Sequence, residues 1–88
     1  MSAHLKKRSL MLSGHDTSVA LEPEFWQVLE SMALQQALPL PVLVARLDTE
    51  RSPGQSLASF LRVRALGWVL GQTPELLTEP PVTPPSLP

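Results

Sequence analysis

The chain has 88 residues, no cysteine and a formal net charge of −1, with seven basic residues against eight acidic ones. A chain of this length forms one domain with a thin core, and domains of this size often gain stability by associating. The absence of cysteine excludes disulfides and thiolate metal sites, and no apolar run is long enough for a signal peptide or a membrane span. We therefore expect a cytoplasmic protein with no membrane contact.

Charge is distributed unevenly along the chain. Residues 1–15 carry the positive charges of Lys6, Lys7 and Arg8 and no negative charge, whereas residues 16–50 are mainly acidic. This pattern predicts a flexible basic arm over residues 1–7, in front of a folded domain over 8–72. Such an arm either attracts phosphate groups or is simply a solvated, frayed terminus.

Two short segments with strand character, 8–12 and 16–21, flank the sequence Ser13-Gly14-His15. From Thr17 to Leu21 apolar and small polar residues alternate, which is the period of a half-buried strand. The inward set is Thr17, Val19 and Leu21, and the outward set is Asp16, Ser18 and Ala20. Gly14 suits the positive φ of a tight turn and His15 is interpreted as a turn residue, so the segments can form a hairpin. Otherwise the second strand pairs with a copy of itself.

Three helices are expected after the strands. Pro23 suits the first position of a helix over about 23–37, which Pro39 and Pro41 interrupt. A second helix is predicted from about Pro41 to Glu50, and a third from an N-cap at Ser56 to a terminating glycine at Gly71. Their buried positions at helical spacing are Phe25, Val28, Leu29, Met32 and Ala33, then Leu40, Leu43, Val44 and Leu47, then Leu57, Phe60, Leu61, Ala65 and Trp68.

The residues offer little for catalysis. His4 and His15 are the only histidines, and the chain has no nucleophile elbow, phosphate-binding glycine loop or dinucleotide fingerprint. We predict no enzyme activity, no metal and no cofactor. Trp26 and Trp68 are interpreted as core residues. Arg62 and Arg64 either bind phosphate or form ion pairs with Asp48 or Glu50.

The composition changes from Thr73 onward. Six of the ten prolines fall in the last sixteen residues. Proline at this density cannot propagate a helix or donate to a sheet, so residues 73–88 are predicted to be a disordered, proline-rich tail.

The order strand, helix, turn, helix resembles the ribbon-helix-helix family of bacterial DNA-binding regulators. The motifs that carry the resemblance are Gly14-His15-x-Thr17-Ser18-Val19-x-Leu21-Glu22-Pro23-Glu24-Phe25-Trp26, Leu43-x-x-x-Leu47-Asp48 and Leu57-x-Ser59-x-Leu61-Arg62. The resemblance covers about residues 6–70. It implies a mostly α-helical fold with a short N-terminal strand, in which two chains pair their strands into one antiparallel ribbon over intertwined helices. The third, C-terminal helix is an addition to that fold.

The resemblance also implies a function. The expected protein is a homodimeric transcriptional regulator that places its ribbon in the major groove of double-stranded DNA, a groove roughly 12 Å wide. The implied DNA-binding residues are Lys6, Lys7 and Arg8 at phosphates, Asp16, Ser18 and Ala20 on the ribbon, and the backbone amides of Val42 and Leu43 at a phosphate. The implied dimer core is Val19, Leu21, Phe25, Leu29, Leu43 and Leu47.

Five positions depart from the family pattern and favour an alternative. The family often has basic residues where this chain has Asp16 and Ala20, and a glycine and a hydroxyl cap where it has Ala37 and Pro39. Pro41 has no N–H to offer a phosphate. The alternative is a dimeric protein-interaction module, antitoxin-like or an adaptor, whose partner binds the third helix or the proline-rich tail.

Overall fold

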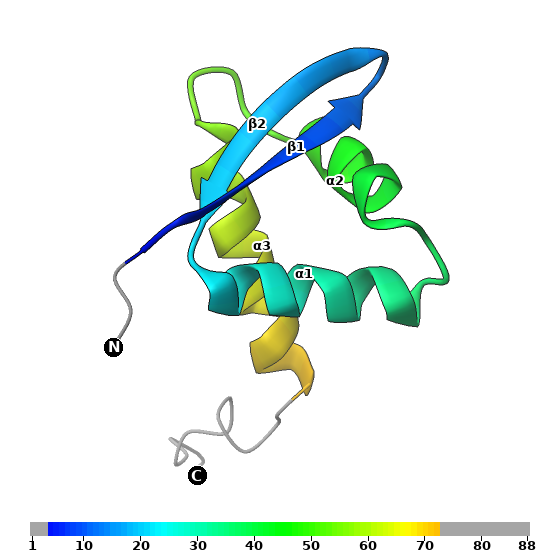
Figure 1. Cartoon of the computed structure of the whole chain (residues 1–88). Coiled ribbons are helices and arrows are strands. Elements are labelled where there is room, and N and C mark those ends of the chain that lie inside the picture. Colours follow the sequence, from blue (N-terminus) through cyan, green and yellow to red (C-terminus); the bar gives the residue numbers. More distant parts are fainter. Residues whose placement is uncertain (1–3, 73–88) are drawn as a thin grey trace, which may run out of the picture.

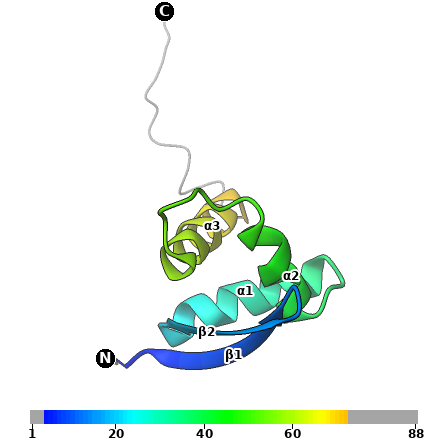
Figure 2. The same ribbon diagram turned by 90° about the horizontal axis from the view of Figure 1, so that it is seen from above.

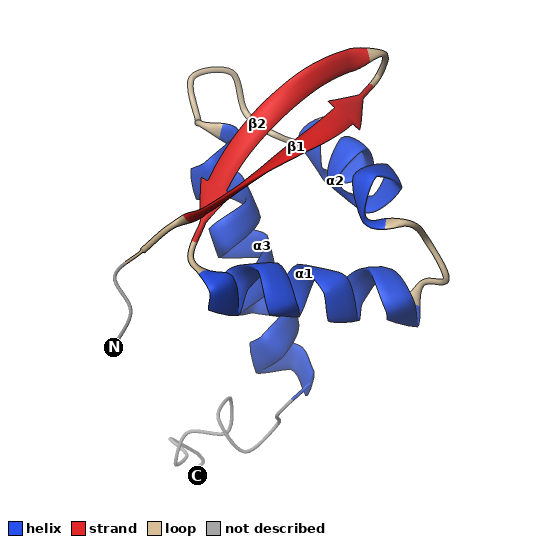
Figure 3. Cartoon of the chain, in the orientation of Figure 1, coloured by secondary structure: helices blue, strands red, loops and turns tan. Residues whose placement is uncertain are grey.

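A computed structural model describes residues 4–72, so the predicted tail over 73–88 lies outside the described residues. The chain forms a β-hairpin followed by three helices (Figure 1). The elements are β1 (Lys6–Leu12), β2 (His15–Leu21), α1 (Pro23–Gln35), α2 (Leu40–Asp48) and α3 (Leu57–Gln72). Figures 2 and 3 show that all three helices lie on one side of the hairpin. One face of the two strands is therefore covered by helices, while the other faces away from them.

The two strands pair within the chain through a two-residue turn. They are antiparallel, in a register that runs from Lys6 opposite Leu21 to Leu12 opposite His15. The turn residues Ser13 and Gly14 both have positive φ, at 52° and 83°. Positive φ at both central positions is the requirement of the type I′ turn, whose twist matches that of the flanking strands. Of the two arrangements left open by the sequence, the structure adopts the hairpin.

The strands begin earlier than the sequence indicates. β1 starts at Lys6 rather than at residue 8, and β2 starts at His15 rather than at Asp16. The expectation that Lys6 and Lys7 belong to a flexible arm is therefore wrong, because both are paired strand residues. The pairing extends this far because β2 continues to Leu21 and because the indole Nε1 of Trp26 donates a hydrogen bond to the Lys6 carbonyl, at 2.7 Å.

A single core lies between the hairpin and the helices. The apolar side chains that alternate along the strands and those at helical spacing in α1, α2 and α3 pack together there. The predicted apolar stripes are thereby confirmed. The buried residues are Leu10, Leu12, Val19, Leu21, Trp26, Leu29, Met32, Ala33, Leu43, Val44, Leu47, Leu61 and Ala65. Phe25, Val28, Leu57, Phe60 and Trp68 pack partly buried around this core. Each fully buried large aliphatic side chain stabilises the fold by about 1.5–3 kcal/mol.

α1 ends two residues before the predicted boundary because the chain reverses direction at Ala37. Ala37 has a φ of 57°, in the left-handed region. The N–H of Leu38 donates to the Ala33 carbonyl at 2.9 Å, and the N–H of Ala37 donates to the Leu34 carbonyl at 3.0 Å. This pair of bonds is the Schellman termination, which usually has glycine at the left-handed position. The alanine here adopts the glycine conformation and carries the steric penalty of its Cβ.

The other helix ends are set in different ways. α2 starts at Leu40 and ends at Asp48, one and two residues before the predicted limits. The Ser56 cap of α3 is confirmed, since the Ser59 N–H donates to its hydroxyl oxygen at 3.0 Å. α3 continues through Gly71 to Gln72, so Gly71 does not terminate it.

Among residues 4–72 no single helix has the length and apolar character needed to cross a bilayer, although α1 and α2, bent by 98°, pass that test as a pair.

Candidate nucleic-acid interface

The uncovered face of the hairpin is the surface that the sequence assigned to DNA. We call it the outer face. It consists of Lys7, Ser9 and Met11 from β1 and Asp16, Ser18 and Ala20 from β2. All of these residues are exposed except Ala20, which is half-buried. The structure thus brings the predicted Asp16, Ser18 and Ala20 together with three residues of β1. A two-stranded ribbon of this kind is one of the elements that the major groove admits.

Two residues of the outer face, Ser9 and Met11, are absent from the sequence-based prediction. Ser9 lies directly opposite Ser18, and Met11 lies opposite Asp16. Met11 is 57% exposed although it is a large apolar residue. The signal that would have found both is the alternation in 8–12, where Leu10 and Leu12 share one face and leave Ser9 and Met11 on the other.

The outer face is chemically mixed and almost neutral. Lys7 is its only cation and Asp16 its only carboxylate. Neither forms an ion pair with any residue between 4 and 72. The serine hydroxyls of Ser9 and Ser18 can donate or accept, and the thioether of Met11 offers an apolar contact. Such a surface suits base edges better than phosphates.

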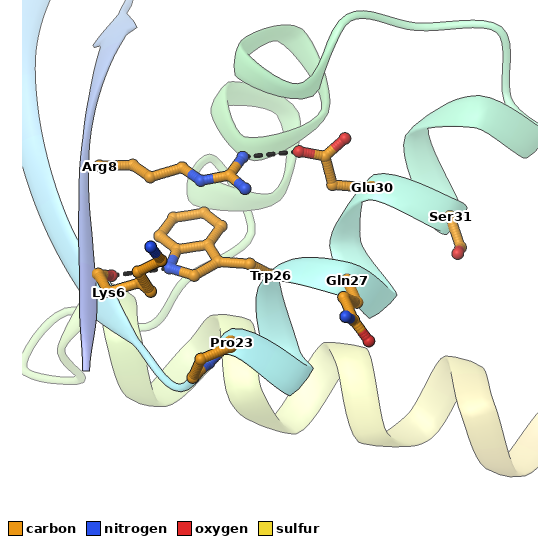
Figure 4. A pocket seen from close by; sticks show the side chains of 7 residues that line it. All are labelled: Lys6, Arg8, Pro23, Trp26, Gln27, Glu30 and Ser31. Carbon is orange, nitrogen blue, oxygen red and sulfur yellow. Dashed lines mark hydrogen bonds and ion pairs between the residues drawn. The ribbon is translucent and has the colours of Figure 1, made fainter. Parts of the chain in front are cut away.

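The three consecutive basic residues of β1 are divided between the two faces. Lys7 is on the outer face, whereas Lys6 and Arg8 project toward the helices. The Arg8 guanidinium lies 4.8 Å above the Trp26 ring, and its Nη1 donates to a carboxylate oxygen of Glu30 at 2.6 Å (Figure 4). Arg8, predicted to contact phosphate, therefore already has an anionic partner within the chain. The prediction that Trp26 is a core residue is confirmed by its exposure of 2%.

Three other arginines also have carboxylate partners. Arg62 binds both carboxylate oxygens of Glu22, at 2.9 and 3.4 Å, and links α3 to the end of the hairpin. The hydrogen bonds from the Arg62 side chain lower the pKa of Glu22, with a further contribution from the Glu22 backbone. Arg64 pairs with Glu50, as one of the sequence alternatives had it, while Asp48 pairs with Arg51 at 2.7 Å instead. Arg62 and Arg64 thus connect α3 to segments that are distant in the sequence, whereas the Arg51 pair is local to the end of α2.

The helix amides predicted to hold a phosphate are occupied within the chain. The N–H groups of Val42 and Leu43 both donate to the Pro39 carbonyl, at 3.0 and 3.1 Å. This counts against the predicted phosphate contact, which needs donors that point away from the helix. At the start of α3, by contrast, the N–H groups of Leu57 and Ala58 have no acceptor within the described chain. Sequence reasoning missed this helix end because it treated the third helix as an addition to the DNA-binding unit.

The residues predicted to form a dimer core are buried inside a single chain. Val19, Leu21, Leu29, Leu43 and Leu47 are between 0% and 4% exposed, and only Phe25 is half-buried. The sequence-based reason for a dimer, a strand without a partner, does not hold because β1 is that partner. Apolar side chains that remain exposed lie elsewhere, among them Val63 at 59% and Leu66 at 54% on α3.

Metal-binding and catalytic groups are not gathered at this surface. Within residues 4–72, no three histidine, cysteine or acidic side chains are placed to hold a metal ion. The interpretation of His15 as a turn residue is wrong, because His15 is the exposed first residue of β2 and pairs with Leu12, while the turn consists of Ser13 and Gly14 alone. What the surface offers chemically is hydrogen bonding and apolar contact rather than proton transfer.

Comparison with known proteins agrees with this architecture. The family model described as a ribbon-helix-helix domain matches residues 5–69, which include the hairpin, α1, α2 and most of α3. Among solved structures, an uncharacterized protein from Bordetella pertussis Tohama I is 36% identical, with a TM-score of 0.69. The match covers 81% of this chain and 60% of that chain, so this protein corresponds to less than two thirds of the Bordetella chain. No curated protein matches.

Proposed function

The chain belongs to the ribbon-helix-helix domain family, and we propose that it is a sequence-specific DNA-binding protein that regulates transcription as a homodimer. The family has a non-enzymatic fold whose members generally dimerise and bind DNA, or act as antitoxins. The observation that carries the proposal for this chain is the outer face, an exposed two-stranded ribbon whose side chains are short or unpaired.

The outer face supplies a set of base contacts. The hydroxyl of Ser18 on β2 can hydrogen-bond to base edges of either polarity. Asp16 accepts from the amino group of cytosine, and Ala20 contacts thymine methyl groups. Direct readout by such groups gives sequence preference, whereas phosphate contacts set register and affinity.

Phosphate contacts come from two places in this proposal. Lys6 and Lys7 form no ion pair within residues 4–72 and supply positive charge along β1. The free N–H groups of Leu57 and Ala58 supply a helix N-terminus of the kind that binds phosphate. They replace Val42 and Leu43 as the preferred backbone donors, since the latter already donate to Pro39.

The proposed dimer pairs the second edge of β2 with β2 of another copy. The described chain uses only one edge of β2, against β1, and an unpaired strand edge is a template for a further strand. Four strands at about 4.8 Å spacing span roughly 14 Å, which exceeds a major groove roughly 12 Å wide. The two central β2 strands therefore enter the groove, and the β1 strands with Lys7 flank the phosphates.

The test is a gel-shift titration of the full chain against the DNA upstream of its own gene, at several salt concentrations. We expect a specific complex with two chains per site and a log–log salt slope of roughly −4, as four phosphates neutralised by Lys6 and Lys7 of two chains give. Sedimentation at micromolar concentration measures the dimer separately. A monomer that binds no DNA even at low salt contradicts the proposal.

A second candidate function rests on the near-neutral outer face. With one cation and one carboxylate there, the DNA surface is weak in charge, and Val63 and Leu66 leave apolar area exposed on α3. Both features favour the alternative of a dimeric interaction module with a protein partner at α3. Purification from the native host after nuclease treatment separates the two functions, because a stoichiometric protein partner together with absent DNA binding supports the module.

A further inference from the structure

A cavity of about 600 Å³ lies between β1 and α1, on the side of the strand opposite to the outer face. Lys6 and Arg8 line it from the strand, and Gln27, Glu30 and Ser31 line it from the helix (Figure 4). Pro23 and Trp26 complete the lining. Because Lys7 points the other way, this cavity lies apart from the outer face, and Lys6 is the one lining residue that it shares with the proposed phosphate contacts.

The cavity has a flat, fixed cation. The guanidinium carbon of Arg8 lies 4.8 Å from the centroid of the Trp26 ring. Its Nη1 lies 2.6 Å from a carboxylate oxygen of Glu30. Trp26 itself is 2% exposed, and its N–H is used by the Lys6 carbonyl, so it serves as a support and not as a ligand contact. The Arg8 side chain is 40% exposed, so it is accessible from the cavity although it contacts Trp26 and Glu30. Aromatic rings stack on guanidinium planes of this kind.

Three polar side chains around the cavity lack partners in the described chain. Lys6 forms no ion pair with residues 4–72, and the side chains of Gln27 and Ser31 make no hydrogen bond there. Two cations therefore face a single carboxylate, that of Glu30. The Arg8–Glu30 contact also shows that a carboxylate fits against this rim of the cavity. The unmatched charge and the free donors favour an anionic ligand.

We propose that this cavity binds a small aromatic carboxylate. Its ring stacks on the Arg8 guanidinium, and its carboxylate pairs with the Lys6 ammonium, with donors from Gln27 and Ser31 completing the contact. A simple anion pairs only with the Lys6 ammonium. An aromatic acid makes the same ion pair and also stacks its ring on the Arg8 guanidinium. This inference does not depend on the proposed function, since none of its steps involves DNA.

The test uses benzoate as the probe and the full-length protein. The readout is the indole N–H resonance of Trp26 in ¹H–¹⁵N spectra, identified by its persistence in Trp68→Phe. We expect a saturable shift with a dissociation constant in the millimolar range, as suits so small a ligand. Acetate and inorganic phosphate at the same ionic strength are expected to bind at least several-fold more weakly, because neither has a ring.

Two variants with matched controls assign the contacts. Lys6→Ala is expected to weaken benzoate binding about tenfold, as loss of a charged hydrogen-bond partner does, while Lys7→Ala, on the outer face, leaves it unchanged. Glu30→Gln is expected to strengthen binding by roughly two- to fivefold, because it removes the one negative charge of the cavity lining, which repels the ligand carboxylate. Glu24→Gln, on the same helix but outside the cavity lining, is its control. All four changed side chains are exposed, so the variants are expected to fold.

Three results would overturn the inference. They are a shift that does not saturate, acetate binding as tightly as benzoate, and Lys6→Ala and Lys7→Ala weakening benzoate equally. The last result would show general attraction of anions to a basic strand rather than a site.

Discussion

The two faces of one hairpin have opposite roles in this protein. On the face toward the helices, Val19 and Leu21 are 4% and 0% exposed, whereas Met11 on the outer face is 57% exposed. Neighbouring residues alternate between the faces. Along each seven-residue strand, side chains that stabilise the core therefore alternate with side chains that are open to a partner. The role of a residue here therefore follows from its odd or even position in the strand rather than from its charge or its neighbours in sequence.

The largest expected effect is on the covered face. Leu21→Ala removes a fully buried side chain between hairpin and helices, and we expect a loss of about 2–5 kcal/mol in the free energy of unfolding. Urea unfolding followed by circular dichroism measures it. The matched change on the outer face, Ser18→Ala, is expected to alter stability by less than about 0.5 kcal/mol. Equal losses in the two variants would contradict the assignment of stability to the covered face alone.

The next effect concerns Lys7 and Arg8, which are neighbours on opposite faces. Lys7→Ala is expected to weaken DNA binding about tenfold at low salt and to reduce the salt slope by roughly 0.9 for each phosphate that is no longer neutralised. Arg8→Gln is expected to leave the salt slope close to that of the wild type, because its guanidinium is held by Glu30 and Trp26. Gel shifts at matched salt concentrations measure the DNA affinity and the salt slope of both variants. A larger change in the salt slope for Arg8→Gln than for Lys7→Ala would show that Arg8 contacts a phosphate after all.

A substitution at the end of α1, on neither face of the hairpin, is expected to alter stability alone. Ala37→Gly relieves the left-handed conformation at the end of α1, where φ is 57°. We expect a gain of about 1 kcal/mol in unfolding free energy. Thermal unfolding measures the gain, and DNA affinity is expected to remain unchanged. A lower melting temperature would show that the entropy of an added glycine outweighs the relief of strain.

The smallest effect depends on pH. Arg62 lowers the pKa of Glu22, so their ion pair stabilises the folded chain at pH values above the usual carboxylate range and is lost as the pH falls through the lowered pKa. We expect Glu22→Gln to be less stable than the wild type near neutral pH and to approach it in acid, once the pH falls below the lowered pKa of Glu22. Urea midpoints at the two pH values measure this. A difference independent of pH would exclude the ionised pair as its cause.

Local patterns in the sequence determined much of this fold. Alternation from Thr17 to Leu21 predicted the faces of β2, Gly14 the turn, Pro23 the start of α1, and Ser56 the cap of α3. Each of these features depends on residues within a few positions of one another, and steric and hydrogen-bonding preferences at that range are readable directly from the chain. The family match over residues 5–69 includes this local block.

The faces of the basic strand residues and the partners of Arg8 and Arg62 depend on tertiary structure. Lys6, Lys7 and Arg8 appear as one basic cluster in the sequence, but strand pairing and the distant Trp26 separate them into two faces. Likewise, Arg62 pairs with Glu22, forty positions away, and not with a nearby acid. Composition and periodicity carry no information on such pairs, because which side chains meet across the molecule depends on how the hairpin and helices pack together.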